Sequence, residues 1–241
     1  MSRVEDPTHW DERSRLDPLA AVLDPAAGSG PRNAHITRIH ELALERSLDL
    51  RGDERVLDFG AGTGRLLGLL ARRAGQAVGA EISPGMAESA NAALAEVPNA
   101  RVETYDGERL PFDDASFDAA VAVLVLQLYF DRPEILQRSL GEIARVLRPG
   151  GRLWLIERAG PAGEEAWTLE RWGKAMSGAR LGMRASMALR GYRTTPMGWL
   201  AQHGALPAGG LRAAASAELA YNHRRGVRAP YTECLIEAVR L

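Results

Sequence analysis

The chain has 241 residues, 46% hydrophobic and 25% charged, which is typical of a globular protein and excludes a disordered one. Its formal net charge of −1 gives no global attraction to nucleic acid or to an anionic membrane. The single cysteine, Cys234, excludes an internal disulfide and favours a reducing compartment. The N-terminus lacks the apolar run of a signal peptide, and no apolar run can span a bilayer. We therefore expect a cytoplasmic chain without stable membrane insertion.

The first 50 residues predict a helical cap. An amphipathic stretch runs from Trp10 to Leu23, and helical apolar spacing covers residues 33–50 after a break rich in glycine and proline.

Residues 51–158 then alternate between strand and helix patterns. The expected strands are 55–59, 77–81, 100–104, 119–126 and 152–157, and the expected helices are 64–74, 84–95 and 133–147. The continuous apolar run at 119–126 is typical of a central parallel strand that is covered on both faces. This alternation predicts an α/β fold with a Rossmann-like, doubly wound, mostly parallel sheet.

The alternation breaks down after Glu157. We expect an insertion or lid over residues 159–200 and a C-terminal β-hairpin region over residues 201–241, within a single domain of residues 1–241. The hairpin would pair Leu211–Leu219 with Glu233–Arg240, after a helix at 197–203.

Basic residues are concentrated in this last part of the chain. Residues 159–241 hold 11 basic and 6 acidic side chains, which favours an anionic partner. Residues 171–193 hold six basic and no acidic side chains, with Trp172, Met176, Met183 and Met187 at helical spacings. This segment suits a substrate lid, plain core packing or a membrane-facing surface, in that order.

Three glycines, Gly60, Gly62 and Gly64, lie between the first expected strand and the helix after it. Glycine at such a turn lets the backbone approach a ligand closely, although glycine turns after strands also have purely structural roles. A dinucleotide fingerprint would need glycine or alanine where Arg65 stands, and no Gly-Lys-Ser/Thr follows for a phosphate loop. The loop therefore predicts a site for an adenosine-type cofactor.

Two acidic residues follow the next two strands. Glu81 ends the second strand, where a carboxylate can accept both hydroxyls of a ribose. Asp106 follows the third, where it can accept an adenine amino group. Alone, Glu81 is compatible with a helix entry and Asp106 with a turn. Their order at consecutive strand ends favours one shared site.

The combined pattern resembles the type 11 class I S-adenosylmethionine-dependent methyltransferases, which include the ubiquinone and menaquinone C-methyltransferases. The resemblance covers residues 55–157 and rests on the stretches RVLDFGAGTGRLLGLLA, VGAEISPGMAESA, YDGERLPFDDASFDAAVAVLVLQLYFD and LGEIARVLRPGGRLWLIE. One departure is Gln127, where the family often has histidine. The N-terminal HWDERSRLDPLAAVLD also resembles a leader that folds over the cofactor, with Trp10 and Arg13 closing the pocket.

The resemblance implies S-adenosyl-L-methionine as cofactor and S-adenosyl-L-homocysteine as product. The cofactor-binding residues expected from the glycine loop and from the strand ends are Asp58, Gly60, Ala61, Gly62, Gly64, Glu81, Ile82, Met86, Asp106, Gly107, Glu108 and Val123. We nominate no catalytic base and expect no metal site; Cys234 is expected to be a core residue.

A small-molecule acceptor in secondary metabolism or quinone synthesis is our first interpretation. A peptide acceptor stays open, and an RNA acceptor is disfavoured because the chain has no basic appendage and no Asn-Pro-Pro-Tyr-type motif. A cofactor-binding protein of the same fold that transfers no methyl group, such as a cyclase or a regulatory module, is the alternative from another class. The acceptor and the oligomeric state are not predicted.

Overall fold

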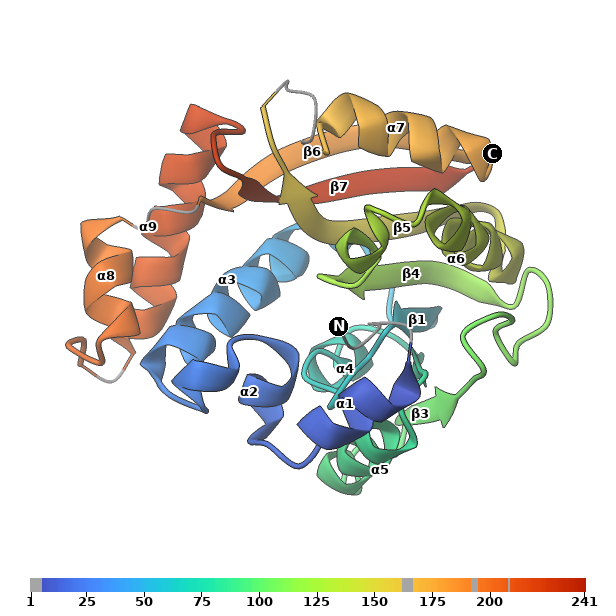
Figure 1. Cartoon of the computed structure of the whole chain (residues 1–241), viewed down its shortest axis with the longest axis horizontal. Helices are drawn as coiled ribbons and strands as arrows, with labels where there is room; N and C mark the ends of the chain where they lie inside the picture. The colour runs from blue at the N-terminus through green and yellow to red at the C-terminus, as the bar shows by residue number, and fades with distance from the viewer. Residues whose placement is uncertain (1–5, 162–166, 192–194, 208) are drawn as a thin grey trace.

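A seven-stranded sheet lies between two layers of helices in the computed structural model, which describes residues 6–161, 167–191, 195–207 and 209–241 (Figure 1). The strand order is β3-β2-β1-β4-β5-β7-β6. Strands β1 to β5 are parallel, and β7 is antiparallel to both β5 and β6. The strands are β1 (Arg55–Phe59), β2 (Gln76–Glu81), β3 (Ala100–Thr104), β4 (Phe117–Val123), β5 (Leu147–Ala159), β6 (Leu181–Gly191) and β7 (Thr232–Arg240).

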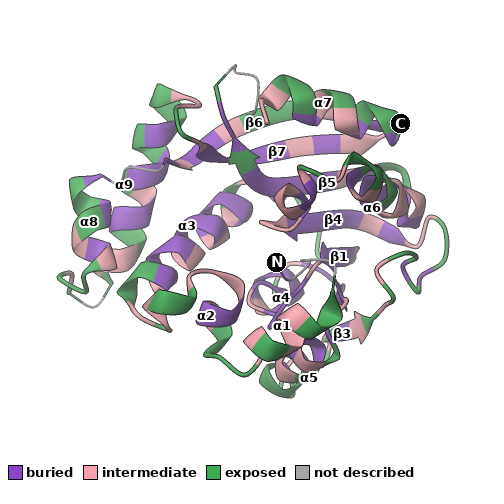
Figure 2. Cartoon of the chain, viewed as in Figure 1, coloured by how far each residue is buried: buried purple, intermediate pink, exposed green. Residues whose placement is uncertain are grey.

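The side chains of β1 alternate between two hydrophobic cores, as the period of a strand requires. Val56 packs with Ile39 and other residues of α3 (Pro31–Ser47), whereas Leu57 packs with Leu140 of α6 (Pro133–Val146). Helices α4 (Leu67–Ala71), α5 (Pro84–Ala93) and α9 (Gly210–Arg225) share the core of α3, and α7 (Leu169–Gly178) shares that of α6. The strands are accordingly mostly buried, whereas α1 (Pro7–Arg13) and α8 (Pro196–Gln202) carry exposed surface (Figure 2).

The predicted α/β fold with a doubly wound, mostly parallel sheet and antiparallel C-terminal strands is confirmed. The first and third strands match their expected bounds, and the fourth ends earlier, because residues 126–129 form the 3₁₀ helix η2 (Leu126–Tyr129).

The predicted hairpin partner was wrong. Strand β7 exists, but residues 211–219 belong to the helix α9, so the antiparallel partners of β7 are β5 and β6. Within α9 the buried residues Ala214, Ala215, Glu218, Leu219 and Asn222 recur at spacings of three and four. This is the period of a helix, with alanine as the best helix former.

The basic segment 171–193 divides between a helix and a strand in its described part. Trp172 and Met176 are buried in α7, as plain core packing requires. Residues 181–191, expected in an insertion or lid, instead form the edge strand β6. Two register irregularities, at Met183/Ala185 and Ala188/Arg190, interrupt its two-residue period, which explains why the sequence did not reveal it.

The N-terminal segment folds into short helices, α1, α2 (Pro18–Val22) and the 3₁₀ helix η1 (Pro25–Ala27), ahead of α3. Each begins at a proline that follows an aspartate whose side chain accepts a backbone N–H of the first turn. Across the described ranges, no helix has both the length and the apolar content that crossing a membrane requires.

Candidate functional site

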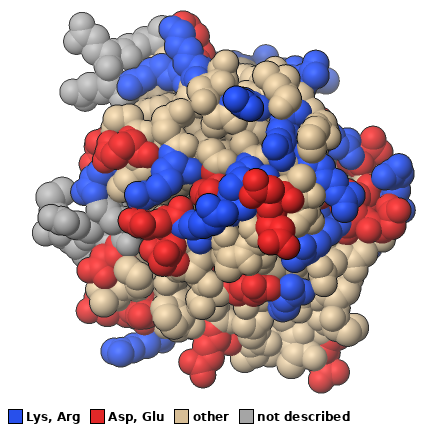
Figure 3. Space-filling model, turned by 90° about the vertical axis from the view of Figure 1, so that its right-hand side faces the viewer, with Lys and Arg blue, Asp and Glu red and all other residues tan. Residues whose placement is uncertain are grey.

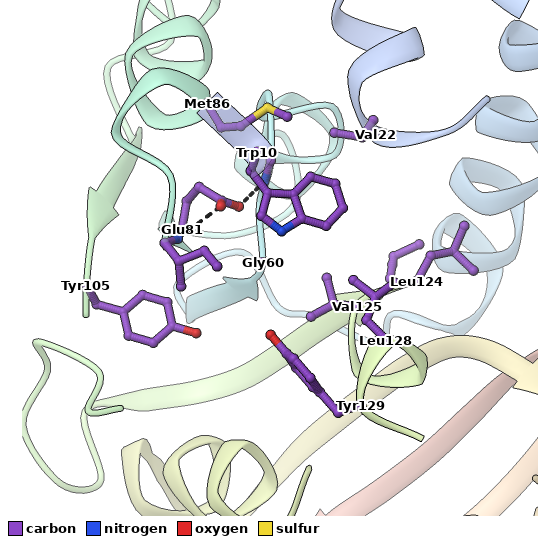
Figure 4. A pocket seen from close by; sticks show the side chains of 13 residues that line it. Trp10, Val22, Gly60, Glu81, Met86, Tyr105, Leu124, Val125, Leu128 and Tyr129 are labelled. Atoms are coloured by element: carbon purple, nitrogen blue, oxygen red, sulfur yellow. Dashed lines mark hydrogen bonds between the residues drawn. The ribbon is translucent and has the colours of Figure 1, made fainter. Parts of the chain in front are cut away.

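The carboxyl ends of β1, β2 and β4 surround a pocket of about 570 Å³ (Figure 4). In an open α/β sheet this is where ligands bind, because the chain leaves neighbouring strands in different directions there. We call it the glycine-loop pocket. Its lining residues are Trp10, Val22, Gly60, Gly62, Glu81, Ile82, Met86, Tyr105, Val123, Leu124, Val125, Leu128 and Tyr129.

The glycine loop follows β1 in a conformation that other residues rarely adopt. Its glycines have φ of +70° at Gly60, +54° at Gly62 and +76° at Gly64. A Cβ atom at Gly60 would lie 2.4 Å from Val125 Cγ2, and one at Gly62 would lie 2.6 Å from Val22 Cγ1. The glycines therefore serve both the backbone turn and the close approach of the neighbouring segments.

Glu81 brings a buried carboxylate to the pocket wall, with an exposed fraction of 6%. Its Oε2 accepts the N–H of Gly62 at 2.8 Å, and its Oε1 accepts those of Ile82 at 2.9 Å and Ser83 at 3.0 Å. Burial raises the pKa of this carboxyl, whereas the three N–H donors lower it. Glu81 thus links the end of β2 to the glycine loop and retains acceptor capacity on the pocket side.

Asp58 lies outside the lining of the pocket. It is buried in β1 on the side of α3, and burial raises its pKa to about 7, with the Arg65 guanidinium lowering it and Glu81 raising it further. Asp58 and Arg65 therefore lie behind the glycine loop.

The structure brings six of the predicted residues into the pocket lining: Gly60, Gly62, Glu81, Ile82, Met86 and Val123. Ala61, Gly64, Asp106, Gly107 and Glu108 do not line it, and they stay predictions together with Asp58. The exposed Asp106 uses Oδ1 to accept the N–H groups of Glu108 and Arg109, both at 2.9 Å. That geometry is the turn former considered from the sequence.

Two tyrosines in the pocket were not predicted. Tyr105 follows β3, Tyr129 ends η2, and their hydroxyl groups point toward each other in Figure 4. Burial, followed by the neighbouring Tyr129, raises the pKa of Tyr105, so its hydroxyl keeps its proton at neutral pH. The only sequence signal was the position of Tyr105 directly after a strand; Tyr129 had none.

The backbone of η2 is held by another buried carboxylate, Glu157 at the end of β5. It accepts the N–H groups of Val125 at 3.1 Å, Leu126 at 2.8 Å and Gln127 at 3.2 Å. Burial raises the pKa of Glu157 to about 8 in spite of these donors. Glu157 thereby fixes the segment that places Leu128 and Tyr129 in the pocket.

The N-terminal helices cover the pocket. Asp11 of α1 accepts the Ser83 hydroxyl and the Gly85 N–H, the latter at 3.0 Å, where α5 begins. Thr63 of the glycine loop donates to the Pro18 carbonyl of α2 at 3.0 Å. The covering role expected for Trp10 fits its position in the lining.

Arg13, which was expected to close the pocket together with Trp10, makes contacts within the N-terminal segment. Its guanidinium donates to the carbonyls of Ala21, Ala20 and Leu23 at 2.7, 3.0 and 3.5 Å. These bonds tie α1 to α2 and so stabilise the covering segment.

A second hollow of about 910 Å³ adjoins the glycine-loop pocket and shares Trp10, Val22, Leu124 and Leu128 with it. We call it the arginine pocket. Its other described lining residues are Arg13, Leu23, Asp24, Pro25, Arg32, Ile36, Gln127, Arg158, Arg190, Tyr231 and Glu233.

A buried cluster of charged residues forms part of the wall of the arginine pocket. Glu233 of β7 accepts two bonds from the Arg190 guanidinium, at 2.8 and 3.1 Å, and lies 3.0 Å from His40 Nε2 of α3. Arg190 and His40 lower the pKa of Glu233 against the effect of burial. Burial lowers the pKa of His40, so a neutral imidazole donates from Nε2 to this carboxylate.

Comparisons with known proteins relate the part of the chain that forms most of the glycine-loop pocket to methyltransferases. Residues 57–155 match the family model described as "Methyltransferase domain". A "Demethylmenaquinone methyltransferase" of Clavibacter sepedonicus is 34% identical over 52% of the chain and 49% of the relative. The "Methyltransferase GfsG" of Streptomyces halstedii is 36% identical over 62% of the chain and 49% of the relative. The chain thus spans about half the length of these curated relatives.

Solved structures share the fold across most of the chain. A geranyl diphosphate C-methyltransferase from Streptomyces coelicolor A3(2) superposes with a TM-score of 0.64 at 18% identity, covering 98% of this chain and 96% of that one. The [4+2]-cyclase SpnF superposes with a TM-score of 0.62 at 22% identity, covering 85% and 81%. At these identities the likeness concerns the fold alone.

Proposed function

We propose that the chain is an S-adenosylmethionine-dependent methyltransferase that acts on a small molecule, since residues 57–155 match the family model described as "Methyltransferase domain". The observation that carries this proposal is the glycine-loop pocket. There, glycines with positive φ and the buried Glu81 carboxylate meet at the ends of β1 and β2.

Each part of S-adenosylmethionine has a proposed partner in the lining of this pocket. Glu81 has acceptor capacity for the ribose hydroxyls, and Ile82 and Met86 offer apolar contact to the adenine. The glycine loop and Val123 leave room for the methionine part. Asp106, Gly107 and Glu108 do not line the pocket. The proposed bond from the adenine amino group would use Asp106 Oδ2, because Oδ1 already accepts two N–H groups.

The bound cofactor supplies a methyl group on a sulfonium, so transfer is an in-line displacement. The protein has to place the acceptor beside that methyl group and exclude water. Trp10, Leu124 and Leu128 lie where the two pockets meet, and we assign them these two tasks.

The titratable side chains of the two pockets support a methyl transfer that relies on holding the cofactor and the acceptor close together. Tyr105 stays protonated and can only donate a hydrogen bond at neutral pH. Among the described lining residues of both pockets there is no histidine. An acceptor that needs little help in losing a proton suits this lining.

A small acceptor also suits the size and the surroundings of the site. The arginine pocket has room for a small ligand. Figure 3 shows the face at which the parallel strands begin, away from the pocket. Acidic and basic side chains are interspersed on it, whereas nucleic acid is bound by a basic surface. The similarity to demethylmenaquinone methyltransferases supports a small acceptor as well.

Calorimetric titration with S-adenosylhomocysteine tests the proposal. We expect Glu81→Ala to weaken binding roughly 5- to 150-fold, because the ribose loses its acceptor. Glu54→Ala is the matched control: Glu54 has the same exposed fraction of 6% and accepts backbone N–H groups of Arg51 and Gly52, but it precedes β1. Absence of heat with the unmodified protein would refute the cofactor, and equal affinities of the two variants would refute the role of Glu81.

A further inference from the structure

Four arginines line the arginine pocket against two carboxylates, and three of the four are already engaged. Arg13 donates to the carbonyls of α2, Arg190 is bonded twice to Glu233, and Arg32 lies 3.2 Å from Asp24. Arg190 and Arg32 thus neutralise both acidic groups of the described lining. Two positive charges remain there, on Arg13, whose N–H groups are used by carbonyls, and on Arg158.

Arg158 is held in place at three points. Its N–H donates to Gln127 Oε1 at 3.2 Å, and its carbonyl accepts the Trp172 indole N–H at 3.0 Å. Its guanidinium lies over the Tyr231 ring, 4.4 Å from the centroid. Stacking of this kind orients the planar guanidinium and leaves its N–H edge for a bidentate partner.

The partner of that edge is missing from the described part of the chain: no carboxylate there forms an ion pair with Arg158, which is exposed. An arginine that is fixed at its backbone and at its ring face is preorganised for a bidentate oxyanion, since carboxylate and phosphate match its geometry.

Part of the lining of the arginine pocket is apolar. Leu124, Leu128 and Val22 belong to both pockets, so a ligand whose charged end reaches Arg158 can extend its apolar body toward the glycine loop. On the proposed function, that end of the ligand would receive the methyl group.

We propose that the arginine pocket binds an acceptor with an apolar body and an anionic group, a carboxylate or a phosphate, and that Arg158 selects it by that group. This inference rests on the proposed function in one respect, the role of the bound ligand as the acceptor of the methyl group. The selection of the anion is a property of the pocket and can be measured separately.

The test uses four probes with eight carbon atoms each: octanoate, octyl phosphate, octanol and octylamine. Their binding to the full chain is followed by tryptophan fluorescence, because Trp10 lines both pockets, with and without saturating S-adenosylhomocysteine. We expect at least one of the two anions to bind about ten- to hundredfold more tightly than octanol, and octylamine to bind most weakly. A larger preference for octyl phosphate or for octanoate identifies the anionic group.

Arg158→Gln should abolish the preference for anions, and Arg158→Lys should restore part of it through charge alone. Arg225→Gln is the matched control, since Arg225 also lies over a tyrosine ring, that of Tyr221 at 5.5 Å, but outside both pockets. It should keep the preference of the unmodified protein.

Three results would overturn the inference. The first is that the unmodified protein binds no anion more tightly than octanol. The second is that the Arg158→Gln variant keeps the preference for anions. The third is that Arg158→Gln weakens the binding of S-adenosylhomocysteine and leaves the binding of octanoate unchanged. The last result would assign Arg158 to the carboxylate of the cofactor. Failure of the unmodified protein to bind S-adenosylhomocysteine refutes the proposed function instead, because the preference for anions is also measured without it.

Discussion

Asp58 and Arg65 show how single residues shape the site without touching it. Asp58 points from β1 toward the core beneath α3, where burial raises its pKa to about 7 and Arg65 partly offsets this effect. Arg65 in turn donates toward His40 Nδ1, 3.4 Å away. The residue that excluded a dinucleotide loop thus has a structural role behind the glycine loop.

The raised pKa of Asp58 predicts a specific dependence of stability on pH. Between the ordinary value of 3.8 and about 7, the unfolded chain loses this proton while the folded chain keeps it, so the free energy of unfolding falls as pH rises. Asp58→Asn removes this contribution. Urea denaturation from pH 4 to 7.5 should show a decline in the unmodified protein, relative to the variant, across that range. Parallel curves would mean that Asp58 is ionised in the folded protein.

The strand-end residues were the predictable part of the site. Gly60, Gly62 and Glu81 could be predicted because strand order and turn chemistry place them at one edge of the sheet. Tyr129 and Val22 could not, because they reach the pocket through the docking of η2 and α2, which no local pattern records. Asp106 accepts N–H groups of its own turn and does not line the pocket, so its contact with the adenine amino group stays a prediction.

Among the elements, α1 and α2 decide how the pocket is closed. The contact of α1 with the rest of the protein at Ser83 and Gly85 depends on one side chain, Asp11, and Trp10 is its neighbour. Because these helices are short, their position depends on such contacts more than on their own stability.

Asp11→Ala should therefore loosen the cover. We expect S-adenosylhomocysteine to dissociate roughly 2- to 30-fold faster, as the loss of a capping interaction of about 0.5–2 kcal/mol implies. Stopped-flow fluorescence of the tryptophans measures this rate. Glu12→Ala, on the exposed side of the same helix, is the control and should leave the rate unchanged; equal rates in both variants would show that α1 is not the cover.

Helix α9 and strand β6 show where the spacing of apolar residues could not decide between helix and strand. Residues 211–219 are apolar enough for a strand, but the alanines and the burial of Glu218 and Asn222 belong to a helix packed on α3. Strand β6 was hidden for the converse reason, since its irregular register removes the alternation that identifies a strand. In both cases tertiary packing decided between local preferences.

At the scale of the molecule, the buried cluster of Glu233, Arg190 and His40 joins the antiparallel half of the sheet to α3. The two strands that carry its charges, β6 and β7, also line the arginine pocket through Arg190 and Glu233. The extension of the sheet beyond β5 thus builds both a core contact and a wall of the site.

Glu233→Gln should destabilise the whole fold by about 3–5 kcal/mol, because it leaves Arg190 buried without an ionised partner. Chemical denaturation measures this change. Glu170→Gln, which breaks the exposed pair with Lys174, is the control and should cost less than about 1 kcal/mol. Similar values for the two variants would show that the buried cluster contributes no more than a surface pair.

The most direct measurement of the central claim is a crystal structure of the chain with S-adenosylhomocysteine. It should show the ribose hydroxyls bonded to Glu81, the methionine part against the glycine loop and the sulfur facing Leu124 and Leu128, toward the arginine pocket. A ligand bound away from the carboxyl ends of β1, β2 and β4 would contradict the account.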